Sequence, residues 1–195
     1  MTQPQEKLKM SSEDYLEFER VAESKHEYFN GEIFAMTGAK VNHNRIGSNI
    51  NRHLGNQLAD RPCDVFLSDM RVKVQKIDKY TYPDIVVVCG DLELEDQKFD
   101  TLLNPMVIIE ILSNSTELYD RGEKFTHYRL IPSLKEYILV SQYRCQIEKF
   151  VRGDDGIWRL FDPCTNMEES IRIETIDCEL PLSDIYYRVE FENKD

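Results

Sequence analysis

Two nearly continuous apolar runs constrain the fold of this 195-residue chain more than any other feature of its sequence. They span residues 85–89 and 106–112, and each has the length of a β-strand. A strand with one exposed face alternates apolar and polar residues, whereas a strand covered on both faces is apolar throughout. The two runs therefore predict central strands of a sheet with other elements packed on both of its faces.

Before these strands the sequence predicts two helices and a hairpin. Ser11 precedes Asp14 by three residues, a spacing that caps a helix, and we expect this helix to end near Ser24. Asn30-Gly31 stands between two β-prone runs and predicts a tight hairpin turn. A longer helix is predicted over residues 43–59, because apolar side chains recur there at every fourth position, namely Ile46, Ile50, Leu54 and Leu58.

The rest of the chain continues this mixed pattern. Residues 65–74 predict one strand, with a bulge or bend between Leu67 and Met70 where the alternation changes parity. Residues 115–130 have a helical pattern and residues 137–140 form another apolar strand, which implies a right-handed parallel crossover. A C-terminal hairpin is predicted over residues 146–161. Without repeats or linkers, the prediction is a single α/β domain over residues 1–195, with its core at about 42–142.

The composition indicates where in the cell the protein is located and in which state its cysteines are. No stretch is long and apolar enough for a membrane span, and the start of the chain, residues 1–7, lacks the plan of a secretory signal, so we expect a cytoplasmic protein. The five cysteines are scattered, and none forms a Cys-x-x-Cys pair. This pattern favours reduced thiols over a disulfide framework or a structural zinc site.

The formal net charge of −12 tells against a protein that wraps nucleic acid non-specifically, because Lys and Arg supply most of that affinity. The acidity is concentrated near the ends and in residues 91–96, while Lys and Arg recur through the middle of the chain. The local field at a site matters more than the total charge.

Glu110 is the most informative residue, because it interrupts an apolar strand where an unpaired carboxylate is costly. Asp84 directly precedes the other central strand, and two carboxylates on adjacent strands can share a divalent cation. Taken singly, Glu110 could instead form a buried salt bridge and Asp84 could simply begin a strand after Pro83. Taken together, the two acids favour a metal site.

The order of elements resembles the core of the PD-(D/E)XK nuclease superfamily. Four segments are similar, more narrowly, to a large family of predicted restriction endonucleases of unknown function within it. They are residues 82–88, 105–116, 119–128 and 131–137, which read YPDIVVV, PMVIIEILSNST, YDRGEKFTHY and IPSLKEY. The resemblance implies a restriction-endonuclease-like α+β core, in which a central mixed sheet is flanked by helices, with N-terminal and C-terminal β-hairpins. It also implies DNA as the substrate and a homodimer.

By this resemblance Asp84 and Glu110 match the two acids of the superfamily and would bind Mg²⁺ or Mn²⁺. The lysine expected two residues after the second acid is missing, because Leu112 stands there. Lys124, in the helix that follows, is the candidate replacement, although an exposed ion pair with Asp120 would also explain it. Lys73 is the fallback.

Further candidates have simpler explanations as exposed charge. Possible additional site residues are Asp69, Glu27, Glu32 and His43, and possible contacts to the DNA backbone are Arg45, Arg52, Arg71 and Arg121.

Two main functions remain open at this stage, a metal-dependent DNA endonuclease and a non-catalytic binding or regulatory protein that keeps the nuclease fold. A third option is a structural subunit that uses the acidic surface for a protein partner, which would show a large exposed apolar patch and no metal pocket. The position of Lys124 distinguishes the first two. The enzyme needs the Lys124 ammonium beside Asp84 and Glu110, whereas the binding protein leaves it in solvent beside Asp120.

Overall fold

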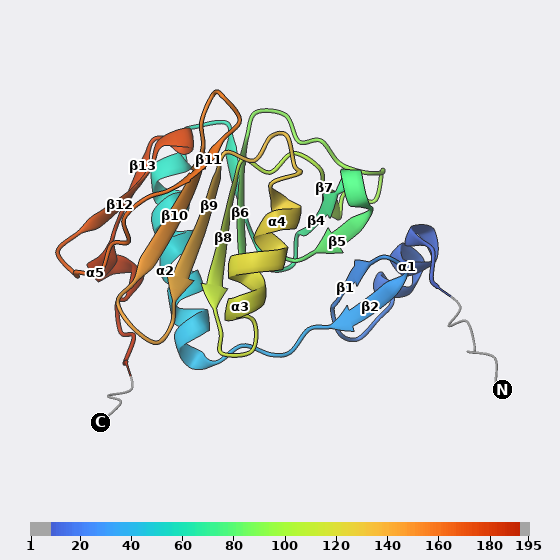
Figure 1. Cartoon of the computed structure of the whole chain (residues 1–195), viewed down its shortest axis with the longest axis horizontal. Coiled ribbons are helices and arrows are strands. Elements are labelled where there is room, and N and C mark those ends of the chain that lie inside the picture. Colours follow the sequence, from blue (N-terminus) through green and yellow to red (C-terminus); the bar gives the residue numbers. More distant parts are fainter. Residues whose placement is uncertain (1–8, 192–195) are drawn as a thin grey trace.

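The computed structural model describes residues 9–191, so the start of the chain that we interpreted above lies outside the described residues. A six-stranded mixed sheet, the central sheet, dominates it, in the order β11-β10-β9-β8-β6-β3 (Figure 1). Strands β8 and β9 are parallel and the other neighbouring pairs are antiparallel. The strands are β3 (Cys63–Leu67), β6 (Ile85–Cys89), β8 (Val107–Leu112), β9 (Glu136–Ser141), β10 (Ile147–Arg152) and β11 (Trp158–Leu160).

Both faces of the central sheet are covered, as the apolar runs predict. Helix α2 (Val41–Leu58) packs on one face, together with α5 (Leu182–Ile185) and the hairpin of β12 (Ser170–Ile173) and β13 (Cys178–Pro181). The predicted stripe of α2 is confirmed, since its four apolar side chains are all buried against this face. The other face carries a helical stretch that consists of α3 (Glu117–Tyr119), a π-helical turn (Asp120–Lys124) and α4 (Phe125–Tyr128).

A second sheet lies beside the central one, in the order β2-β1-β5-β4-β7 (Figure 1). Its β1–β2 hairpin turns at Asn30 and Gly31, whose φ angles of 53° and 85° are those that an Asn-Gly turn supplies. Helix α1 (Ser12–Glu19) begins as predicted, because the Ser11 hydroxyl accepts from the Asp14 amide at 3.1 Å. The strands are β1 (His26–Phe29), β2 (Glu32–Ala35), β4 (Arg71–Val74), β5 (Lys79–Thr81) and β7 (Thr101–Leu102).

Two predicted boundaries are wrong. The single strand expected over residues 65–74 is two strands, β3 and β4, which belong to different sheets. The change of parity marks a turn, in which the Met70 amide donates to the Leu67 carbonyl at 3.0 Å, rather than a bulge within one strand. Helix α1 ends at Glu19 and not near Ser24, because Val21 is 82% exposed and has no core to bury against.

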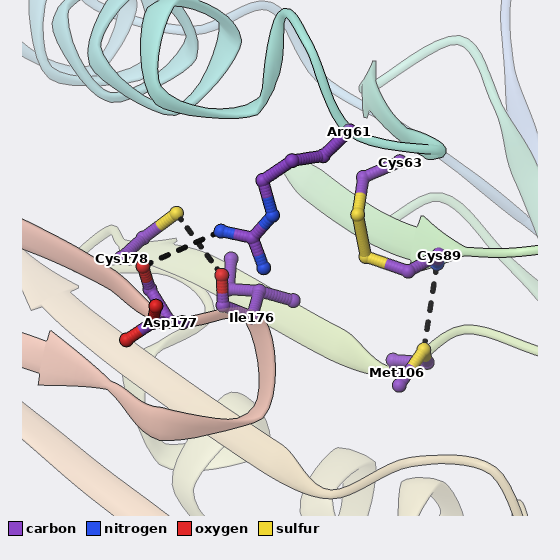
Figure 2. Close-up of a disulfide and its surroundings, with 7 residues drawn as sticks. All are labelled: Arg61, Cys63, Cys89, Met106, Ile176, Asp177 and Cys178. Atoms are coloured by element: carbon purple, nitrogen blue, oxygen red, sulfur yellow. Dashed lines mark hydrogen bonds between the residues drawn. A yellow bond between two sulfur atoms is a disulfide. The ribbon is translucent and has the colours of Figure 1, made fainter.

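The prediction of five reduced thiols is also wrong, since Cys63 and Cys89 form a disulfide (Figure 2). The two residues face each other directly in the antiparallel ladder of β3 and β6, with their Cα atoms 3.9 Å apart. Their separation of 26 positions gives no sign of this pairing, because only the register of the strands brings them together. The other three cysteines, Cys145, Cys164 and Cys178, are free.

Within the described residues, no helix is both long enough and apolar enough to cross a membrane.

Replacing Ile50 by alanine tests the packing of α2 on the central sheet. Ile50 is fully buried, so Ile50→Ala should lower the free energy of unfolding by about 2–5 kcal/mol through lost burial and a residual cavity. Urea denaturation gives the value. Ser48→Ala, on the exposed side of the same helix, should change it by less than about 0.5 kcal/mol. Equal effects of the two substitutions would contradict the assigned helix face.

The disulfide predicts the number of reactive thiols. Protein purified without reductant and then unfolded should react with three equivalents of a thiol reagent, from Cys145, Cys164 and Cys178. A reductant should raise the number to five. Five reactive thiols before reduction would show that Cys63 and Cys89 are not paired in solution.

Candidate active site

Asp84 and Glu110 lie next to each other on the central sheet. The register of β6 and β8 pairs Ile85 with Ile109, and continuing it by one residue places Asp84 opposite Glu110. The Asp84 amide lies 3.4 Å from Glu110 Oε2, and Asp84 Oδ2 accepts from the Ile111 amide at 2.7 Å. The antiparallel register and the Ile111 amide therefore hold the two carboxylates side by side.

The alternation of β8 decides which way Glu110 points. Val107, Ile109 and Ile111 pack against α2, whereas Ile108 and Leu112 pack on the opposite face with α4. Glu110 has the parity of the second set, so its side chain lies under the helical stretch of residues 117–128. There it is 3% exposed and accepts a hydrogen bond from the Tyr128 hydroxyl at 2.9 Å.

Lys124 comes down from this helical stretch onto Glu110. Its Nζ lies 2.9 Å from Glu110 Oε1, 3.6 Å from Asp120 Oδ1 and 3.5 Å from Glu27 Oε1. Lys124 belongs to the π-helical turn, where one extra residue per turn changes the direction of the side chains. Asp120 and Lys124, at the two ends of that turn, are both buried. The ammonium therefore occupies the interior and not solvent beside Asp120.

Acidic groups outnumber the lysine at this point. Lys124 contacts three carboxylates, and Asp84 is a fourth beside Glu110. Burial raises the pKa of Glu110, and the charges of Asp84 and Asp120 add to the shift while Lys124 opposes it. The pKa of Lys124 lies well above its usual value, because the charges of its acidic neighbours outweigh its burial. The four carboxylates and Lys124 together have excess negative charge, which a further cation would offset.

His43 approaches the pair from the first turn of α2. Its Nε2 lies 3.2 Å from Asp84 Oδ2, and both side chains are 18% exposed. A protonated His43 ring can therefore form an ion pair with this carboxylate from the solvent side.

These residues line one cleft, with a volume of about 740 Å³. One wall is the segment between β2 and α2, residues 36–40, and the other is the turn into α3, residues 113–116. Figure 1 shows that segment passing the end of β8 on its way to α2. Asp84, Glu110, Lys124, Glu27 and His43 all contribute to the lining of the cleft.

Residues 12–183 match the sequence profile of the Uma2 family, described as "Putative restriction endonuclease". The chain belongs to this family. It is 36% identical over 181 residues to the uncharacterized protein slr1290 of Synechocystis sp. (strain ATCC 27184 / PCC 6803 / Kazusa), and the match covers 92% of each chain. It is also 36% identical over 151 residues to the uncharacterized protein sll1609 of the same organism, covering 77% of this chain and 85% of the relative.

A solved structure is similar in fold to this Uma2 chain. It is the crystal structure of "a putative nuclease belonging to DUF820" from Anabaena variabilis ATCC 29413, with a TM-score of 0.73 at 17% identity. The match covers 91% of this chain and 97% of the other. The predicted α+β architecture, with a mixed sheet flanked by helices, is therefore confirmed.

Other residues of the Uma2 chain that the sequence suggested for the site lie away from the cleft. Arg71, suggested as a DNA contact, is 3% exposed and bonds to Thr101 and Tyr82, so it is not available to a phosphate. Lys73 pairs with Asp78 and Glu95 outside the cleft. Three more are Asp69, which is 93% exposed in the turn after β3, Glu32 on the exposed strand β2, and Arg121, paired with Glu117 and Glu148.

The two other suggested arginines lie on α2. Arg45 lines a second hollow beside the cleft, and its guanidinium donates to the Arg188 carbonyl at 2.7 Å. Arg52 donates to the Asn49 side chain at 3.2 Å and does not line the cleft.

Sequence reasoning missed several residues that hold the site in shape. Tyr128 bonds to Glu110, Thr81 donates to Glu27, and Gln142 donates to the Leu112 carbonyl at 2.9 Å. Tyr128 follows Lys124 by four residues, and this helical spacing could have indicated that both reach Glu110. Thr81 and Gln142 carry no such signal, since Thr81 reaches the site from β5 and Gln142 from the bend that follows β9.

Proposed function

We propose that this Uma2 chain is a metal-dependent endonuclease that hydrolyses phosphodiester bonds of DNA. The observation that carries the proposal is the Lys124 ammonium, buried 2.9 Å from Glu110 in the cleft that also holds Asp84. Leu112 occupies the position at which the resemblance predicts the lysine, and Lys124 supplies an ammonium to the same face of the sheet. This placement favours an enzyme over a non-catalytic nuclease fold, which would leave Lys124 in solvent.

The donors fit Mg²⁺ or Mn²⁺. Among residues 9–191 no three His, Cys, Asp or Glu side chains converge as a ready-made metal cluster. Mg²⁺ does not need one, because it commonly binds through one or two carboxylates and completes its shell with water and substrate phosphate. Asp84 and Glu110 would hold the ion. The negative charge of the carboxylates around Lys124 exceeds its single positive charge, and this excess favours the binding of a cation. When bound, the ion lowers the pKa of a coordinated water and neutralises charge on the phosphate.

The protein's own groups have separate tasks in this proposal. Lys124 remains protonated, because its pKa lies well above the usual value, so it stabilises negative charge rather than accepting a proton. Tyr128 fixes the second acid through its hydrogen bond to Glu110 Oε1. His43 Nε2 lies 3.2 Å from Asp84 Oδ2, close enough for a protonated imidazole to pair with this acid at the mouth of the cleft. The side chains that surround the carboxylates are thus positioned before any substrate arrives.

The homodimer implied by the family resemblance stays a prediction. Cleavage of both strands of a duplex needs two such sites, so analytical ultracentrifugation of the full chain bears directly on the mode of cutting.

Metal binding by the two acids can be measured by isothermal titration with Mn²⁺. The wild-type protein should bind the ion. Asp84→Asn and Glu110→Gln should each weaken binding by at least about 10–100-fold, the usual cost of losing even a group that only supports a metal ligand. Asp69→Asn removes an equal charge outside the cleft and should bind as the wild type does. Unchanged binding in either site variant would refute the assignment of the ligands.

The role of Lys124 can be separated from that of the fallback lysine. With Mg²⁺ or Mn²⁺ and plasmid or oligonucleotide DNA, Lys124→Met should lower the cleavage rate by about 10²–10³-fold, the usual cost of losing a preorganised donor. Lys73→Met should leave the rate near that of the wild type, because Lys73 pairs with Asp78 and Glu95 outside the cleft. Circular dichroism checks that both variants are folded. A rate lost in Lys73→Met and retained in Lys124→Met would reverse the assignment.

A further inference from the structure

The cleft continues into a second hollow. The second hollow has a volume of about 700 Å³ and is lined partly by α2 and partly by the C-terminal residues Glu190 and Phe191. Four residues line both hollows, namely Ala39, Lys40, Gln142 and Tyr143. The two hollows therefore adjoin, and together they form a groove that leads from β2 past the carboxylates to the end of the described chain.

Cations line both parts of this groove, beside the carboxylates of the cleft and Glu190 of the second hollow. Lys25 lines its first part, Lys40 lines both parts, and Arg45 lines the second. Lys40 is exposed, while Lys25 is partly offset by its ion pair with Asp69 at 2.9 Å. Such a sparse row suits the phosphates of a single strand. These cations are too few for a duplex, because non-specific binding of a duplex depends on the neutralisation of many phosphates. The net charge of −12 opposes duplex binding further.

Aromatic side chains accompany the cations. Phe34, at the cleft end of β2, is 49% exposed and lines the cleft. Tyr143 lines both hollows, and its hydroxyl accepts from the Asn114 amide at 2.9 Å, which fixes the ring across the groove. Exposed or fixed rings of this kind stack with unpaired bases of any sequence. The bases of an intact duplex are already stacked on one another, so they leave no free face on which these rings could stack.

The depth of the carboxylates points the same way. Glu110 is 3% exposed at the floor of the cleft, so the reacting phosphate has to enter between the two walls. A cleft of about 740 Å³ is within the usual size of a small-ligand pocket, about 300–1,000 Å³. It can admit a few nucleotides of one strand.

We infer that the groove binds single-stranded DNA and that single strands, rather than intact duplexes, are the substrate. This inference rests on the proposed nuclease function for the cleavage step, but the binding step can be tested without it. A single-strand substrate needs one site per strand and does not depend on a dimer.

Binding is measured by fluorescence anisotropy with Glu110→Gln protein, so that no cleavage interferes. The probes are a fluorescein-labelled thymidine oligonucleotide of about 12 nucleotides, within the usual site size, and a labelled duplex of the same length. The single strand should bind at least about tenfold more tightly than the duplex. Equal or tighter binding of the duplex would overturn the inference.

Two matched pairs of substitutions, made in the Glu110→Gln protein, test the groove itself. Phe34→Ala should weaken single-strand binding by about tenfold, whereas Phe99→Ala, 70% exposed but outside the groove, should not change it. Lys40→Met should lower the salt dependence of binding by about 0.7 in the slope of log K against log salt, and Lys76→Met should leave it unchanged. Equal effects within both pairs would show that the strand binds elsewhere.

Cleavage by the wild-type protein with Mn²⁺ separates this inference from the proposed function. Faster cleavage of the single strand supports both. Cleavage of the duplex with no preference for the single strand would support the proposed nuclease function and would overturn the assignment of the groove to single-stranded DNA. Tight binding of the single strand with no cleavage of either probe would support single-strand binding by the groove and would overturn the proposed nuclease function.

Discussion

The site depends on the ion pair between Glu110 and Lys124, whose charged atoms lie 2.9 Å apart in the interior. Neither charge is stable there alone, because a buried ion without its partner costs several kcal/mol, about 3–5 when one member of a pair is removed. The two residues come from different layers, the sheet and the helical stretch above it. The pair therefore holds the helical stretch in a fixed position over Glu110 of β8.

Aromatic packing supports this arrangement from the side away from the cleft. Phe125 directly follows Lys124 in the chain, and its ring stacks on that of Tyr137 of β9 with the centroids 5.0 Å apart. Tyr137 also donates to the Asp120 carbonyl at 2.9 Å, at the start of the π-helical turn. Both ends of that turn are thus anchored on β9. The direction of the Lys124 side chain is then fixed by packing rather than by its charge alone.

The second sheet completes the cleft by bringing Glu27 to it. Strand β1 pairs with β5 in the second sheet, and a cluster of tyrosines packs beside them, in which the rings of Tyr28 and Tyr80 lie 5.8 Å apart. Thr81 of β5 donates to Glu27 and contacts the Tyr128 hydroxyl at 3.2 Å, so it joins the two halves of the site. The net negative charge of the chain is an objection to nucleic-acid binding at the level of composition. Locally, the four carboxylates of the site lie in a groove that Lys25, Lys40 and Arg45 also line.

The sequence by itself determined most of the elements and placed the two acids, Asp84 and Glu110, on neighbouring strands. The apolar runs, the stripe of α2 and the Asn-Gly turn each reflect local burial or backbone preference, which a sequence records directly. Glu110 was recognisable because a carboxylate within an apolar strand requires compensation. Only the tertiary structure decided what depends on register and on contacts between distant segments. It paired Cys63 with Cys89, assigned β3 and β4 to different sheets, buried Arg71, and placed Lys124 over Glu110 where Leu112 left no cation. Spacing along the chain does not specify such distances, because they arise from how the layers pack.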